Sequence, residues 1–137
     1  MKGYLAVIDI IRRDGPVGLL IGGSGVGVAR VFPGDAPQGA VYPLVMVDAT
    51  DGEPFDTKSG VSVLDNDQVK VVCYAETDTS AYDLATKVRT ALDGQTGTHN
   101  GLYVEGLRWL RQTSYDENYT NKRVRVHEQD YEVRIRL

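Results

Sequence analysis

The sequence predicts an α+β domain in which a four-stranded antiparallel sheet carries two helices packed on one face. The apolar period changes from two residues to about 3.6 at Thr77–Thr79, so one strand runs directly into an amphipathic helix. Segments before and after this unit alternate apolar and polar residues, as half-buried strands do. The chain has 137 residues, 42% of them hydrophobic, and is most simply a single domain, residues 1–137.

The strand and helix at the centre of the chain are the best-defined elements. Alternate residues of the strand share one apolar face, and the helix predicted over Thr79–Asp93 carries one apolar stripe. Asp78 or Thr79 can cap the start of the helix, and Gly94 suits the left-handed position after its end. The strand face is Val69, Val71, Cys73 and Ala75, and the helix stripe is Ala81, Leu84, Ala85, Val88, Ala91 and Leu92.

The N-terminal third supplies a second helix and two strands. Met1–Arg13 has helical apolar spacing, with a strand as the alternative. A short helical turn is expected at Gly18–Ile21, and a short strand at Arg30–Phe32. Ala40–Thr50 is predicted to be an interior strand because both of its faces are partly apolar. Asp51–Gly60 then reads as a polar connection to the next strand, Val61–Glu76.

The C-terminal third predicts two more strands. Leu102–Ser114 changes its apolar parity near Gly106, which indicates a bulge. A loop is expected at Tyr115–Asn121, as is a polar loop at Gln95–Asn100. In the last strand Val124 and Val126 have the opposite parity to Tyr131, Val133 and Ile135, so we expect a bulge or bend between His127 and Asp130.

The sheet face away from the helices is also partly apolar, through Val72, Tyr74 and Leu110. Two interpretations remain open: a subunit partner covers this face, or water tolerates a mixed surface.

Composition limits the classes of function that this chain can have. The net charge is −4, with eight Lys or Arg against thirteen Asp or Glu in residues 1–100, which argues against nonspecific duplex binding through phosphates. It does not forbid a surface past which DNA moves. We expect no signal peptide and no bilayer-spanning segment, and therefore a protein made and used in a cytoplasm.

For each candidate chemical motif, a structural explanation is favoured over a functional one. Gly22–Gly27 lacks the Lys-Ser/Thr ending of a phosphate loop, and a flexible loop is favoured. Cys73 lies among valines and is expected to be a small buried hydrophobe, while His99 and His127 are expected at the surface. We therefore predict no catalytic residue, no cofactor and no metal.

Charged and aromatic residues suggest contact surfaces. The acidic group formed by Asp48, Asp51, Glu53 and Asp56 lacks the ligand pattern of a calcium loop, so a solvated loop is favoured. The arginines of the last two strands alternate with acids, which favours cross-strand pairing over a partner-facing charged surface. Tyr115 and Tyr119 are either contact residues or packed on their hairpin.

The order of these elements resembles the small tail-completion, or tail terminator (head-to-tail joining), proteins of long-tailed bacteriophages and prophages. The resemblance runs from Val31 to Leu137. It rests on Val-Tyr-Pro-Leu-Val at 41–45, Val-Val-Cys-Tyr-Ala at 71–75, the helix ending Val-Arg-Thr-Ala-Leu-Asp-Gly, Val-Glu-Gly-Leu at 104–107 and Asp-Tyr-Glu-Val-Arg-Ile at 130–135.

This resemblance implies a structural, non-enzymatic virion protein. Such proteins form a ring, commonly six-fold, on the head-proximal end of the tail tube, where the ring ends tube polymerisation and joins tail to head. The implied partners are copies of the chain, the tail tube protein and a head connector or neck protein, with DNA only passing through and no membrane. The implied location is the virion tail, after synthesis in the cytoplasm of a bacterial host. The segment expected to reach a neighbouring subunit or the tube contains Asp51, Glu53, Phe55 and Asp56. The candidate contact tyrosines are Tyr115 and Tyr119.

Two alternatives remain open. One is another neck or head-completion protein of the phage connector. The other is a small ligand-binding enzyme that uses the Gly22–Gly27 loop, in which Ser24 would be the residue to test.

Overall fold

A computed structural model describes residues 2–25, 27–54, 64–119 and 122–136. The described elements, in chain order, are α1 (Gly3–Arg13), α2 (Gly15–Gly18), β1 (Val31–Pro33), β2 (Leu44–Pro54), β3 (Leu64–Ala75), α3 (Asp78–Leu92), β4 (Gly97–His99), β5 (Leu102–Tyr119) and β6 (Lys122–Arg136).

The strands form one mixed six-stranded sheet in the order β1-β2-β3-β6-β5-β4. β1 runs parallel to β2, and the other neighbours are antiparallel. The predicted four-stranded antiparallel sheet with two helices on one face is therefore wrong. β4 was missed in the expected polar loop, although Asn100 and Gly101 both have positive φ, as the Asn-Gly turn of a tight hairpin requires. β1 was expected as a strand. Its parallel pairing with β2 requires the connection between the two strands to return to the end of the sheet where β1 began.

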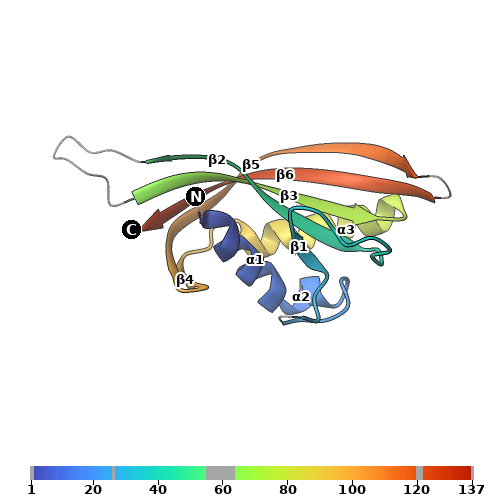
Figure 1. Cartoon of the computed structure of the whole chain (residues 1–137), viewed down its shortest axis with the longest axis horizontal. Helices are drawn as coiled ribbons and strands as arrows, with labels where there is room; N and C mark the ends of the chain where they lie inside the picture. Colours follow the sequence, from blue (N-terminus) through green and yellow to red (C-terminus); the bar gives the residue numbers. More distant parts are fainter. Residues whose placement is uncertain (1, 26, 55–63, 120–121, 137) are drawn as a thin grey trace.

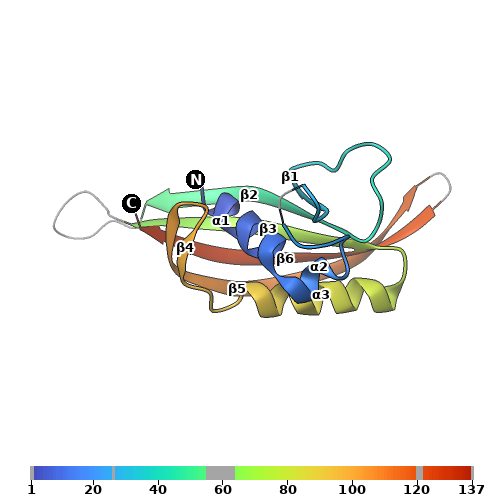
Figure 2. The same cartoon turned by 90° about the horizontal axis from the view of Figure 1, so that it is seen from below.

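The helices lie beneath the sheet in Figure 1, and Figure 2 shows α1 crossing it diagonally while α3 runs along the edge strand β5. The main core lies between them and joins the apolar face of α1 to Val45, Val71 and Tyr131 of the sheet. Residues far apart in the sequence therefore share one apolar interior.

Both long helices pack as predicted, but the cap of α3 is Thr77 rather than the predicted Asp78 or Thr79. The Thr77 hydroxyl accepts the Ser80 N–H at 3.1 Å, and the whole predicted stripe of α3 is buried. α1 is confirmed as a helix rather than a strand. Its first N–H, that of Gly3, donates to the buried Asp67 carboxylate on β3 at 2.8 Å, so the sheet itself supplies the cap.

The parity change in β6 has a different cause from the one predicted. The bulge expected near Gly106 in β5 is confirmed, with a second one between Trp109 and Arg111. β6, however, pairs with β3 in one continuous register from Arg125 to Arg136, so the expected bulge or bend there is wrong. Val124 and Val126 simply face a second core on the opposite side of the sheet. The loop expected at Tyr115–Asn121 is also wrong in part, because β5 continues to Tyr119.

The chain itself covers one end of the second sheet face. Leu44, Val72 and Tyr74 form a second apolar cluster with Val124 and Val126, and part of the segment between β1 and β2 packs against it. Farther along this face, cross-strand ion pairs join β5 to β6, as the alternating charges predicted; Arg111–Asp130 (2.7 Å) and Arg108–Glu132 (3.5 Å) are examples. The chain therefore covers part of the described second face itself, and cross-strand ion pairs occupy another part.

Candidate assembly surface

The two long hairpins extend past the helical layer at opposite ends of the sheet (Figure 1). β5 has 18 residues and spans about 60 Å at roughly 3.3 Å per residue, whereas α3 has 15 residues and spans about 22 Å. β5 is therefore much longer than the helix α3 that packs along it. We call these projections the β2–β3 arm (described residues 48–54 and 64–67) and the β5–β6 arm (described residues 113–119 and 122–128).

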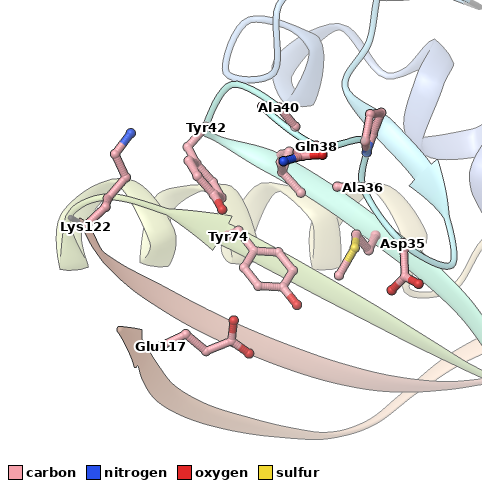
Figure 3. A pocket seen from close by; sticks show the side chains of 12 residues that line it. Asp35, Ala36, Gln38, Ala40, Tyr42, Tyr74, Glu117 and Lys122 are labelled. Atoms are coloured by element: carbon pink, nitrogen blue, oxygen red, sulfur yellow. The ribbon is translucent and has the colours of Figure 1, made fainter. Parts of the chain in front are cut away.

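A hollow of about 610 Å³ lies on the second sheet face beside the β5–β6 arm (Figure 3). Its floor is Leu44, Met46 and Tyr74, and the connection between β1 and β2 forms one wall. Tyr42 and Tyr74 pack with ring centroids 6.5 Å apart. The hollow is concave, aromatic and large enough for a side chain of another molecule.

Charged groups stand at the rim of this hollow: Asp35, Glu117 and Lys122. The Lys122 ammonium is 2.8 Å from the Glu76 carboxylate and 5.5 Å from the centre of the Tyr42 ring. Burial, and next the nearby Glu117 charge, raise the pKa of Tyr74, so its hydroxyl stays protonated at neutral pH. The arrangement is suited to holding an apolar or aromatic group inside a charged rim.

The structure separates the residues that the sequence grouped as candidates. Asp51 and Glu53 lie on β2 in one arm, and Tyr119 ends β5 in the other. Phe55 and Asp56 fall outside the described residues. The side chains of Asp51, Glu53 and Tyr119 are also not described.

Tyr115 is the candidate whose environment the structure gives. Its hydroxyl donates to the Glu128 carboxylate at 2.8 Å, and its ring packs against the second apolar cluster. Tyr115 therefore packs on its own hairpin, one of the two roles considered for it, at the opposite end of the sheet from Asp51 and Glu53 (Figure 1).

A buried polar network under α3 escaped prediction. His127 was expected at the surface, but it is 6% exposed and its Nδ1 lies 2.7 Å from the Ser114 hydroxyl. Gln129 is fully buried; its amide donates to the Ala85 carbonyl at 2.9 Å, and its oxygen accepts the Tyr131 hydroxyl at 2.7 Å. The signal was in the sequence, because His127 and Gln129 share the parity of Tyr131. Burial lowers the pKa of His127, and Arg125 lowers it further.

The other candidates for chemistry have structural surroundings. Cys73 is fully buried, as predicted, and burial raises its pKa to about 12. His99 is half-buried, with Nε2 3.0 Å from the Thr96 carbonyl. In the glycine-rich segment, the Gly25 N–H donates to the Arg12 carbonyl at the end of α1, at 2.6 Å. Gly22 has φ +95°, and a Cβ there would lie 2.5 Å from the Arg30 guanidinium.

Within residues 2–25, 27–54, 64–119 and 122–136, no three His, Cys, Asp or Glu residues come together as metal ligands do. Asp51 and Glu53 lie on β2 rather than in the polar connection expected for them, and Asp48 lies in the strand predicted for it. No helix among the described elements has the length and apolar character needed to span a bilayer.

Comparison with known proteins gives one family and one fold. The family model described as tail completion protein gp17 matches residues 6–136, nearly the whole chain. A chain from the solved structure titled "Virion of native gene transfer agent (GTA) particle" superposes with a TM-score of 0.68 at 18% sequence identity, over 98% of this chain and 94% of that chain. A comparison with curated proteins finds no match.

Proposed function

The chain belongs to the tail completion protein gp17 family, a family of phage structural proteins, and from this premise we propose that it forms a ring at the head-proximal end of the tail tube. The family membership that the sequence indicated is thus confirmed. The proposal adds that the ring has six subunits, ends tube polymerisation and joins the tail to a head connector or neck protein. DNA would pass through the ring without specific binding, consistent with the net charge of −4.

The observation that best supports a ring is the pair of unlike arms at opposite ends of the sheet (Figure 1). A ring needs heterologous contacts, in which one surface of a subunit meets a different surface of the next. An arm that reaches beyond the body of its own subunit can meet a neighbour. The similar fold within a gene transfer agent virion particle gives independent support for a role in a virion.

We assign the contacts to the two arms. The β2–β3 arm contributes Asp51, Glu53, Phe55 and Asp56 to a subunit or tube contact, and Tyr119 lies at the end of the other arm. Tyr115 supports that second arm from within, through its hydrogen bond to Glu128. The hollow beside this arm is a second place where a virion protein would dock an apolar or aromatic side chain.

Adding the purified protein to tail tubes assembled without it tests this function. Negative-stain images are expected to show one annular cap per tube, and tubes that have been capped should no longer lengthen when tube protein is added. Light scattering of the free protein gives the mass of any ring formed without a tube.

A test variant carries Glu53→Lys and Asp56→Lys in the β2–β3 arm and is compared with the wild type. This variant should keep the thermal unfolding of the wild type and lose capping. Capped tubes that continue to grow, or wild-type protein that copurifies with portal rather than with tubes, would refute the tube-ending role and favour another neck protein.

A further inference from the structure

The wall of the hollow beside the β5–β6 arm is held at both of its ends. The Gly34 N–H donates to the Val47 carbonyl at 2.9 Å, and the Arg30 guanidinium donates to the Pro43 carbonyl at 2.8 Å. Between these two points, the two alanines of the wall pack against the second apolar cluster. A partner would therefore meet a cavity that the fold has already formed, which lowers the cost of ordering on binding.

The floor of the hollow offers aromatic surface together with one polar group. Tyr74 is only 8% exposed, and its hydroxyl points into the hollow on the side where Glu117 and Asp35 lie (Figure 3). This hydroxyl has no hydrogen-bond partner among the described residues. The Tyr42 ring packs beside it. An occupant finds ring surface for an apolar or aromatic group and a hydroxyl for a polar one.

The charge around the hollow is mainly acidic. Lys122 is the only base among the described residues that line it, and Glu76 offsets this charge from 2.8 Å away. No ion pair between described residues includes Asp35, which also lines the hollow. After burial, the Glu117 charge contributes most to the raised pKa of Tyr74, which places that carboxylate near the floor. A positively charged group would be attracted here.

A second copy of this chain has few basic side chains to place in the hollow. Most of the described lysines and arginines form ion pairs with acids of their own subunit. Arg12 and Arg30 donate to backbone carbonyls instead, and the Arg89 guanidinium lies 3.8 Å from the centre of the Trp109 ring. A different protein supplies a basic occupant more readily.

We propose that the hollow binds a segment of a different virion protein, in which an aromatic side chain adjoins an arginine or a lysine. This inference rests on the proposed virion role and names the chemistry of the partner that docks beside the β5–β6 arm. The aromatic side chain packs on Leu44, Met46 and Tyr74, and the cation lies at the rim beside Asp35 and Glu117. The acids attract the cation, while the tyrosine rings offer faces on which a cation or another ring packs.

Two short peptides test this chemistry on the purified full chain. Acetyl-Phe-Arg-amide and acetyl-Phe-Glu-amide share the aromatic side chain and differ in charge. Titration followed by two-dimensional amide NMR gives both dissociation constants and shows which amides are perturbed. The arginine peptide is expected to bind about tenfold more tightly, to shift the amides of Gln38, Met46 and Tyr74, and to weaken as salt is added. No binding of the arginine peptide, equal binding of the two peptides, or shifts away from the hollow overturn the proposal.

A charge reversal at the rim tests the site itself. Asp35 is exposed and lies outside the helices and strands, so Asp35→Lys should leave the fold intact. It should weaken the arginine peptide by about tenfold and strengthen the glutamate peptide. The matched control is Asp83→Lys, which makes the same change in net charge on α3, on the other face of the sheet. Equal losses in the two variants would mean that net charge attracts the peptide, and would overturn the site.

Photocrosslinking tests the occupant in assembled particles. Gln38 is exposed and lines the hollow, so p-benzoylphenylalanine in its place would reach a bound segment. A link to the tube protein or a neck protein is expected, at a stretch where an aromatic residue adjoins a basic one. A link to a second copy of this chain, a link to a stretch without a basic residue, or no link overturns the proposal. The peptide tests need neither ring nor tube, so a failure to cap tubes refutes the proposed ring alone.

Discussion

Replacing Gln129 by leucine should destabilise the protein although the volume hardly changes. Gln129 is fully buried, and its side-chain oxygen accepts the Tyr131 hydroxyl at 2.7 Å. Leucine leaves that hydroxyl, itself on a fully buried residue, without an acceptor. An unsatisfied buried polar group costs about 1–3 kcal/mol, and we expect about 2 kcal/mol for Gln129→Leu.

The matched control is Tyr131→Phe, which removes the donor instead. It should cost a comparable amount, because the Gln129 oxygen then lacks its donor. The double variant has neither orphaned group, so its loss should be smaller than the sum of the single losses by about 1–2 kcal/mol.

Urea unfolding followed by the fluorescence of the single tryptophan, Trp109, measures these differences. With a slope of about 1.5 kcal/mol/M, a 2 kcal/mol loss lowers the midpoint by roughly 1.3 M. Losses that add within about 0.3 kcal/mol would show that the two side chains are not coupled, and would refute the argument from hydrogen-bond satisfaction.

Three further outcomes follow from burial. Leu84→Ala, at a fully buried position of α3, should cost about 2–5 kcal/mol in the same urea assay, whereas Leu19→Ala, at 88% exposure, should stay within about 0.5 kcal/mol; equal effects would contradict the assigned core. The folded state lowers the pKa of His127, so the unfolded chain binds more protons and stability should fall as the pH drops below about 6.5; His127→Asn should lose less stability over the same range. Cys73 should react with a thiol reagent only as fast as the protein unfolds, given burial and a pKa raised to about 12, and rapid labelling of native protein would rule out the buried placement.

Local pattern was enough to predict the elements whose partners are a continuous apolar surface. α3 keeps the predicted stripe from Ala81 to Leu92 in the core, and β5 has its bulge beside Gly106. Both depend on the period of neighbouring side chains, which the sequence states directly. Family membership was also readable, since the order and spacing of these elements is itself a sequence property.

What the sequence left undetermined depends on distant residues. The same parity change that indicated a bulge in β5 marked in β6 a switch from one core to another, and only the packing of Val126 against Leu44 and Tyr74 tells these apart. His127 and Gln129 are polar, so their burial follows from partners that the fold brings to them, Ser114 and Ala85. The hollow beside the β5–β6 arm likewise exists only once the sheet and the connection between β1 and β2 are in place.

Sequence alone therefore determined which segments are helices and most of the strands, one apolar face of each, and the family. Tertiary structure decided the six-stranded mixed order, the second core and the separation of the two arms. The physical reason is the distance along the chain over which each effect acts. The period of side chains is set by near neighbours in sequence. Strand order and the hydrogen bonding of buried polar groups are set by residues that meet only once the helices have packed on the sheet.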